Sequence, residues 1–162
     1  MRSALFFLLA LAFTYSPAFA ENKVDPDIER APIDTRANRE NLIGNWYLSQ
    51  PTNKGGVWRV LSSLSADGSY ISRFEEYLDG RLVRKYSEEG LWGVSGDIHF
   101  TIRQVIHARG RSFAAPQDQP ENYVAYRVVE LDASSFTYES VVSENRFQSR
   151  KVPEGFEFPD PY

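Results

Sequence analysis

From residue 42 onward, apolar and polar side chains alternate in short runs that are separated by turn residues. A period of two indicates β-strands, because successive side chains of a strand point to opposite faces. Asp67-Gly68 and Asp79-Gly80 are typical of hairpin turns, since glycine readily adopts a positive φ angle. The pattern predicts strands at residues 42–49, 57–65, 69–78, 81–94, 98–107, 122–131, 136–143 and 146–152.

The run at residues 98–107 alternates most clearly, and its apolar residues share one face, which we expect to point into the core. These residues are Ile98, Phe100, Ile102 and Ile106. The residues on the opposite face are His99, Thr101, Arg103 and His107. The preceding run is long, and we expect it to bend or break at Gly90.

Three segments lack the strand pattern. Residues 21–41 are rich in charge and proline and predict a flexible lead-in, with one helical turn around residues 35–41. Residues 108–121 predict a polar loop of about fourteen residues, which is long for a simple connection. The tail at 153–162 alternates prolines with aromatic residues, so it either folds back to plug one end of the barrel or offers an extended segment to a partner.

Sequential strands joined by tight turns favour an all-β fold, an antiparallel up-and-down β-barrel of eight or nine strands over residues 42–152. Closure of a barrel removes exposed strand edges. A β-sandwich is the alternative. A barrel of this size either fills with side chains or holds one small ligand. The chain has no cysteine, so the core must hold the fold without disulfides.

Residues 1–20 have the order of a signal peptide. Arg2 precedes an apolar run at 4–13, and the small-x-small triplet Ala18-Phe19-Ala20 follows. The apolar run is roughly half of the ~20 residues that span a membrane. We therefore expect cleavage after Ala20, no permanent membrane anchor, and a periplasmic or secreted protein.

Charge and composition narrow the function classes. The chain carries 18 Lys and Arg against 22 Asp and Glu, a net charge of -4, which disfavours nucleic acid as a partner. His99 and His107 lie eight residues apart on one strand face, roughly 26 Å, so they cannot share a metal ion. No serine lies in a nucleophile motif. We predict no catalytic residue, no metal site and no cofactor.

Four short motifs remain after the strands are placed. They are Gly44-Asn45-Trp46, Ala66-Asp67-Gly68-Ser69-Tyr70, Gly90-Leu91-Trp92-Gly93-Val94-Ser95-Gly96-Asp97, and Leu131-Asp132 followed by Phe136. Together they resemble lipocalins of the calycin superfamily, in particular small secreted bacterial lipocalin-like domains. The resemblance implies that Trp46 closes the barrel floor against a late basic residue, and Arg146 and Arg150 are the candidates.

The chain also departs from the lipocalin pattern. It has no convincing Thr-Asp motif and no cysteine pair that would tie the C-terminal segment to the barrel. Tyr47-Leu48-Ser49, which follows Trp46, lacks the Gly-x-Gly of haem-binding barrels of this shape. Haem is therefore not expected.

Inward polar residues among aromatic ones are the candidate ligand contacts, because small-molecule sites are mostly apolar with a few orienting polar groups. An inward Arg84 would favour an anionic ligand. One of Glu88 and Glu89 should also point inward, where burial raises a carboxyl pKa. The candidates on the expected inner faces are Trp58, Ser62, Tyr70, Phe74, Arg84, Tyr86 and Trp92.

The leading expectation is an exported lipocalin-like protein that binds a small apolar or amphipathic ligand inside the barrel. The alternative is a protein-interaction or inhibitor module with a filled barrel, which would contact an envelope protein through residues 108–121 and the tail. An enzyme is the third class, and it would need a buried carboxylate or histidine beside Arg84.

Overall fold

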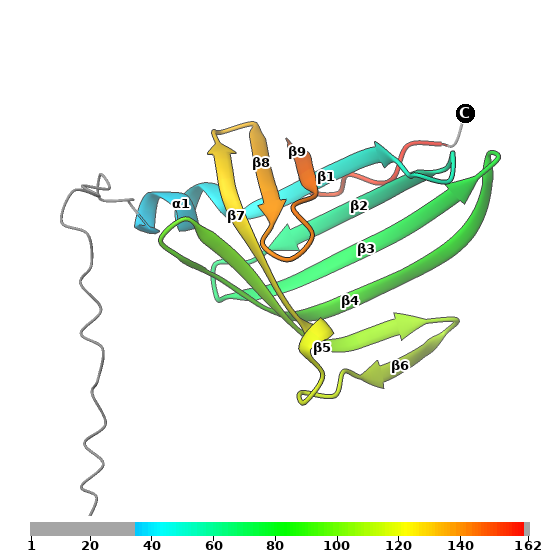
Figure 1. Ribbon diagram of the computed structural model, residues 1–162, viewed down its shortest axis with the longest axis horizontal. Helices are drawn as coiled ribbons and strands as arrows, with labels where there is room; N and C mark the ends of the chain where they lie inside the picture. The colour runs from blue at the N-terminus through cyan, green and yellow to red at the C-terminus, as the bar shows by residue number, and fades with distance from the viewer. Residues whose placement is uncertain (1–34, 161–162) are drawn as a thin grey trace, which may run out of the picture. The chain divides into compact units, whose positions relative to one another are not determined.

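The computed structural model describes residues 35–160, and Figure 1 shows the arrangement of their helix and strands. This part of the chain is almost entirely β-structure. The elements are α1 (Thr35–Leu42), β1 (Gly44–Pro51), β2 (Val57–Leu64), β3 (Ser69–Leu78), β4 (Arg81–Ser95), β5 (Ile98–Ala108), β6 (Arg111–Ala114), the 3-10 helix η1 (Pro120–Asn122), β7 (Tyr123–Leu131), β8 (Ser135–Ser140) and β9 (Arg146–Val152).

The strands form one antiparallel sheet in the order β4-β3-β2-β1-β9-β8-β7-β5-β6. β4 also pairs with β5, so eight strands close into a barrel and β6 lies outside it. Apart from the excursion at β6, each barrel strand pairs with the strands before and after it in the chain. The antiparallel up-and-down barrel is therefore confirmed, and the β-sandwich alternative is wrong.

Turn chemistry explains why strand boundaries follow the sequence so closely. Asp79 and Gly80 have φ angles of 50° and 71° and connect β3 to β4 as a two-residue turn. Positive φ at both central residues is the geometry that matches the twist of paired strands. The predicted bounds of β3 and β9 agree with the structure.

The bend expected at Gly90 is present as an irregularity in the β4–β5 pairing between Glu89 and Gly90. A Cβ atom on Gly90 would lie 1.9 Å from the carbonyl oxygen of Ile102 and 2.9 Å from Cε1 of Tyr70. Only glycine fits here without displacement of the neighbouring backbone. The irregularity lets the Tyr70 ring lie against β4 inside the barrel.

The start of the barrel differs from the prediction, because Leu42 ends α1 and β1 begins at Gly44. The helical turn expected around residues 35–41 is present as α1. Leu42 is fully buried, and its carbonyl oxygen accepts a 2.7 Å hydrogen bond from Nε1 of Trp46. The proposed signal at 1–20, and the lead-in as far as residue 34, lie outside the described residues.

The prediction of an irregular loop at 108–121 is wrong in part. Arg109 and Gly110 have φ angles of 53° and 70°, which is a second two-residue turn of the same kind. Residues 111–114 then return along β5 as β6, and η1 leads into β7. Figure 1 shows the β5–β6 hairpin extending from the barrel.

The face assigned to the core on β5 is wrong for Phe100 and Ile102, although Ile106 pairs with Glu88 on the inner face beyond the irregularity at Gly90. His99 and Thr101 line the barrel interior, so alternation places Phe100 and Ile102 on the outer surface. Phe100 covers Gly93 of β4 there, since a Cβ on Gly93 would meet the Phe100 ring at 2.5 Å. On β5, the apolar residue Phe100 therefore makes a contact with the neighbouring strand β4 on the outer surface of the barrel, and does not point into the core.

The C-terminal tail folds back on the outside of the barrel. Phe156 and Phe158 pack against Tyr47, with ring centroids 5.2 and 6.3 Å away. The carbonyl oxygen of Pro159 accepts a 2.7 Å hydrogen bond from Arg59 of β2. The tail covers an outer face of the sheet and does not plug an end of the barrel.

Candidate functional site

The barrel encloses a cavity of about 80 Å³. Aromatic rings and polar groups from all eight barrel strands line it, which is the composition typical of a small-molecule site. The lining residues are Trp46, Trp58, Val60, Ser62, Leu64, Tyr70, Ser72, Phe74, Glu88, His99, Thr101, Tyr126, Phe136, Tyr138 and Ser149.

Four of the seven candidate ligand contacts lie on this lining: Trp58 and Ser62 from β2, and Tyr70 and Phe74 from β3. The inward faces expected for these two strands are confirmed. Ser62 and Ser72 face each other across the β2–β3 pair, and their hydroxyl oxygens are 2.8 Å apart. Each hydroxyl therefore has a partner inside the barrel.

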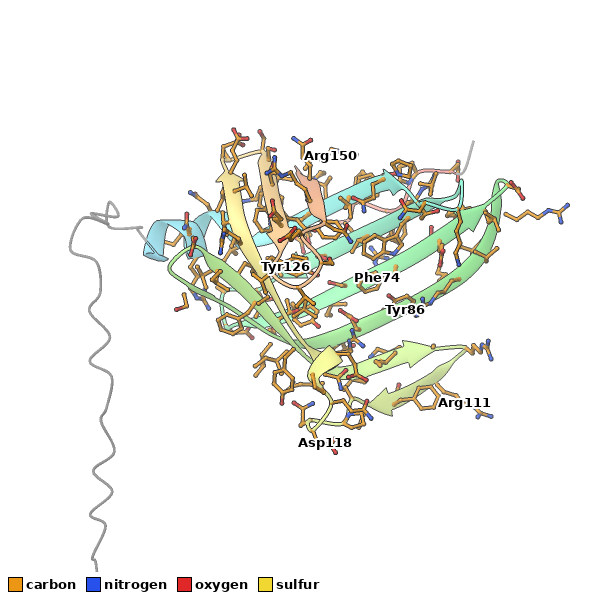
Figure 2. All side chains as sticks on the ribbon, in the orientation of Figure 1. Phe74, Tyr86, Arg111, Asp118, Tyr126 and Arg150 are labelled. Carbon is orange, nitrogen blue, oxygen red and sulfur yellow. The ribbon has the colours of Figure 1, made fainter. Side chains whose placement is uncertain are left out.

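Aromatic rings gather at the end of the barrel opposite α1. Phe74 stacks on Tyr86 with ring centroids 4.5 Å apart, and Figure 2 shows these two side chains together on β3 and β4. Trp58 lies 6.0 Å from Phe74 and 6.2 Å from Phe147. We call Trp58, Phe74, Tyr86 and Phe147 the aromatic cluster. Its contacts restrict access to the cavity from this end.

Arg84 and Trp92 have different surroundings from those expected. Arg84 is exposed, and its guanidinium lies 4.7 Å from the centroid of the Tyr86 ring. Arg84 lies on the same face of β4 as Tyr86, as expected, but its exposed side chain is not part of the cavity lining. Trp92 is buried, and its Nε1 donates a 2.9 Å hydrogen bond to the carbonyl oxygen of Ser65. Trp92 is a structural residue next to the cavity.

The arginine that does lie next to the interior is Arg103 of β5. Its Nε is 2.8 Å from Oε2 of Glu88, whose side chain is 12% exposed. Tyr70 donates a 3.3 Å hydrogen bond to Oε1 of the same carboxyl group. Burial raises the pKa of Glu88, and Arg103 and Tyr70 partly oppose this rise. Burial, together with the Glu88 carboxylate, also raises the pKa of Tyr70.

His99 is the second titratable group on the lining. It is 6% exposed, and burial lowers its pKa to about 4, so the imidazole is neutral at physiological pH. Neither ring nitrogen hydrogen-bonds to another group within residues 35–160. Tyr126, which Figure 2 labels on β7, stacks on His99 with ring centroids 6.1 Å apart.

The floor residue expected from the lipocalin resemblance, Trp46, is buried beside α1 and has a basic neighbour. That neighbour is Lys151, whose Nζ lies 5.2 Å from the centroid of the Trp46 ring. Lys151 pairs with Trp46 across β1 and β9, so their side chains share a face. Both predicted partners are wrong, because Arg150 lies over Tyr47 on the opposite face and Arg146 pairs with Glu139.

Sequence reasoning identified some lining residues and missed others. Glu88 could be found, because it lies two residues from Tyr86 and four from Trp92 on one strand face. His99 and Thr101 were assigned to the outer face because their neighbours are apolar. The β7, β8 and β9 contributors, Tyr126, Tyr138 and Ser149, carry no local signal beyond ordinary strand alternation.

Two further findings concern the described residues alone. No three His, Asp or Glu side chains within residues 35–160 are placed together to hold a metal ion. None of the helices in that range is long and apolar enough to cross a membrane.

The strand order agrees with the barrel that the lipocalin resemblance implied. No family model and no curated protein match the chain. Among solved structures, the chain is similar to a lipocalin-like protein from Bacteroides uniformis. The two are 19% identical, the match covers 69% of this chain and 99% of that protein, and the TM-score is 0.45.

Proposed function

We propose that this protein binds a small amphipathic ligand inside its barrel. The observation that carries the proposal is the cavity inside the barrel, which both aromatic rings and polar groups line. In a filled structural core, Glu88 and Arg103 at the inner face would only destabilise the fold, because desolvation of charged groups is costly. In a ligand site such groups are useful, since a few polar groups orient an otherwise apolar ligand.

The size of the cavity limits the ligand. At about 80 Å³, it is well below the roughly 300–1,000 Å³ of sites for drug-sized molecules. The ligand is therefore small, or the aromatic cluster moves when a larger ligand enters. Rotation of Trp58 and Phe147 would open the cavity without breaking a strand pair, because both side chains are only half-buried.

The proposed setting is the periplasm or the outside of the cell. The support for this is the order of Arg2, the apolar run at 4–13 and Ala18-Phe19-Ala20. N-terminal sequencing or intact mass of the protein purified from an expressing bacterium tests the proposal. A mature chain that begins at Glu21 in the periplasmic fraction supports it, whereas an uncleaved chain in the cytoplasmic fraction contradicts it.

Binding is tested by native mass spectrometry of protein purified without denaturation, followed by organic extraction. Ser62→Leu fills the cavity from β2, and Ser63→Leu is the matched control, because Ser63 hydrogen-bonds outside the cavity to Asn45. We expect a bound mass that is lost in Ser62→Leu and retained in Ser63→Leu. The same bound mass in both variants would contradict an interior site, as would no binding of any compound in a broad screen.

A second candidate, contact with an envelope protein, has support from the β5–β6 hairpin. Within residues 35–160, β6 pairs with β5 alone, so one edge of β6 can accept a strand from another chain. Phe113 on this strand is 49% exposed. The tail offers less support, because Phe156 and Phe158 already pack on the barrel.

Cross-linking in envelope extract tests this second candidate. Phe113→Ser removes the apolar side chain, and Val142→Ser, in the β8–β9 turn, is the control because Val142 is 90% exposed. A cross-linked species lost only in Phe113→Ser supports a contact at the hairpin. Equal cross-linking in both variants contradicts it.

A further inference from the structure

His99 is buried at the cavity with both ring nitrogens unused by the described part of the chain. Three aromatic side chains surround it. The ring centroids of Trp92, Tyr126 and Phe136 lie 6.0, 6.1 and 5.7 Å from the centroid of its ring. These neighbours supply apolar contact and give the imidazole nitrogens no hydrogen bond.

The protonation state of His99 defines what it offers. Burial keeps the imidazole neutral, and a neutral imidazole has one N–H donor and one nitrogen acceptor. A buried polar group without a hydrogen-bond partner destabilises the structure that contains it. The two nitrogens point away from each other, so a compact molecule reaches one of them, and a molecule that carries both an acceptor and a donor can hydrogen-bond to either nitrogen.

Charge in the cavity argues for an uncharged molecule. Glu88 and Arg103 form an ion pair and compensate each other. Arg103 lies four residues from His99 along β5, roughly 13 Å between Cα atoms. Burial is the only cause of the lowered pKa of His99, and no charged side chain among residues 35–160 contributes to it, so a charged ligand at His99 would lose its hydration without compensation.

We propose that the cavity recognises an uncharged, compact ligand, or the uncharged end of a longer one, that carries a hydrogen-bond donor and acceptor and binds His99. This inference rests on the proposed interior binding. The aromatic surroundings of His99 favour a planar group. A cavity of about 80 Å³ is roughly half of one known to hold benzene, so the group that enters it without movement of the lining is no larger than a five-membered ring.

Three small molecules test separately the contributions of hydrogen bonding, shape and charge to binding. Pyrazole is an uncharged five-membered ring with adjacent donor and acceptor nitrogens, whereas thiophene has a similar shape and neither function. Acetate is compact but charged. Each is titrated into the full mature protein labelled with ¹⁵N in its histidines, and long-range ¹⁵N–¹H spectra follow the two ring nitrogens of His99.

We expect pyrazole to shift the His99 nitrogen signals to saturation, with an affinity about tenfold or more above those of thiophene and acetate. His107 provides the internal reference, because it lies outside the cavity and already contacts Ser112 and Glu89. His99→Phe should abolish pyrazole binding, and His107→Phe should not. If His99→Phe does not fold, the pyrazole titration of the unmodified protein still tests the inference, because it observes the His99 nitrogens directly.

Other results overturn the inference about His99, and they can be told apart from a failure of the proposed interior binding. Thiophene that binds as well as pyrazole shows an interior site that ignores His99. Acetate that binds more tightly shows a charged-ligand site. No response of His99 to pyrazole overturns the inference directly, and the bound mass from native mass spectrometry then decides separately whether the barrel binds a ligand.

Discussion

Arg103 Nε lies 2.8 Å from Glu88 Oε2, across two neighbouring strands at the inner face of the barrel. The two residues are not direct pairing partners, because Glu88 pairs with Ile106 and Arg103 with Gly90. The irregularity at Gly90 lies within this part of the β4–β5 pair, and Tyr70 hydrogen-bonds to the same carboxyl group. The backbone irregularity at Gly90 and the Glu88–Arg103 ion pair therefore lie in the same part of the barrel.

Arg103→Met should destabilise the protein by about 2–3 kcal/mol at neutral pH, because it leaves the Glu88 carboxylate buried without a counter-charge. Adding Glu88→Gln should restore part of the loss, since no charge then remains to be compensated. Urea unfolding of both single variants and the double variant measures the coupling. Losses that simply add would show that the ion pair contributes nothing.

His99 should make the fold sensitive to mild acid. Its pKa is about 4 in the folded protein against 6.5 ordinarily, so below pH 6.5 the unfolded chain binds a proton that the folded chain does not. The free energy of unfolding should therefore fall as the pH drops from 6.5 to 4, by roughly 3 kcal/mol in all.

His99→Phe removes that proton, so its free energy of unfolding should change less over the same range. The comparison with the unmodified protein by urea unfolding cancels the other titrating groups. Glu88 has the opposite effect on the free energy of unfolding. Its pKa is raised in the folded protein, so protonation of Glu88 at low pH stabilises the folded state. Parallel pH profiles for the two proteins would contradict a neutral buried His99.

Gly90→Ala should destabilise the barrel by about 3 kcal/mol, because its Cβ would overlap the Ile102 carbonyl oxygen and the Tyr70 ring. Gly80→Ala is the control. Gly80 has a φ of +71° with nothing within 4 Å of the added atom, so its cost is backbone strain of about 1–2 kcal/mol. Thermal or urea unfolding measures both, and an equal or smaller loss for Gly90→Ala would show that β4 and β5 can separate there.

Lys151→Met should cost about 1 kcal/mol. It removes the cation over the Trp46 ring and the 3.1 Å hydrogen bond from Lys151 Nζ to the Asn41 carbonyl oxygen. Arg146→Met is the matched control, since the ion pair of Arg146 with Glu139 is largely exposed and worth less than about 0.5 kcal/mol. Urea unfolding followed by tryptophan fluorescence ranks the two. A larger effect for Arg146→Met would reverse the assignment.

Phe156→Ala should loosen the tail and cost about 2 kcal/mol, because Phe156 packs on Tyr47 and beneath the guanidinium of Arg150. Faster proteolysis after residue 152 should accompany the loss. Glu157→Ala, which removes an exposed ion pair with Arg73, should change stability by less than about 0.5 kcal/mol. Limited proteolysis with mass spectrometry compares the two variants, and equal cleavage rates would contradict a docked tail.

The strands and turns were readable in the sequence because their causes are local. Alternation sets the two faces of a strand, and the Asp79-Gly80 turn sets the bounds of β3 and β4. The Arg109-Gly110 turn obeys the same chemistry but has no conspicuous turn pair in its sequence, so β6 was not predicted. Closure of eight strands into a barrel followed from the number of sequential hairpins.

Residues of the candidate site were predictable only on strands where the large apolar side chains of the alternating pattern lie on the face inside the barrel. Trp58, Ser62, Tyr70 and Phe74 belong to strands whose large side chains point inward. On β5 this condition is not met, because Phe100 and Ile102 lie outside and His99 lies inside. A period of two identifies two faces and cannot say which one is enclosed.

The sequence by itself determined the all-β class, the hairpin order and several inner faces, since these depend on neighbours within a few residues. The tertiary structure alone decided that Lys151 covers Trp46, that the tail lies outside, and that the cavity is about 80 Å³. Those features depend on register between strands that are more than a hundred residues apart and on how side chains from eight strands fill one volume.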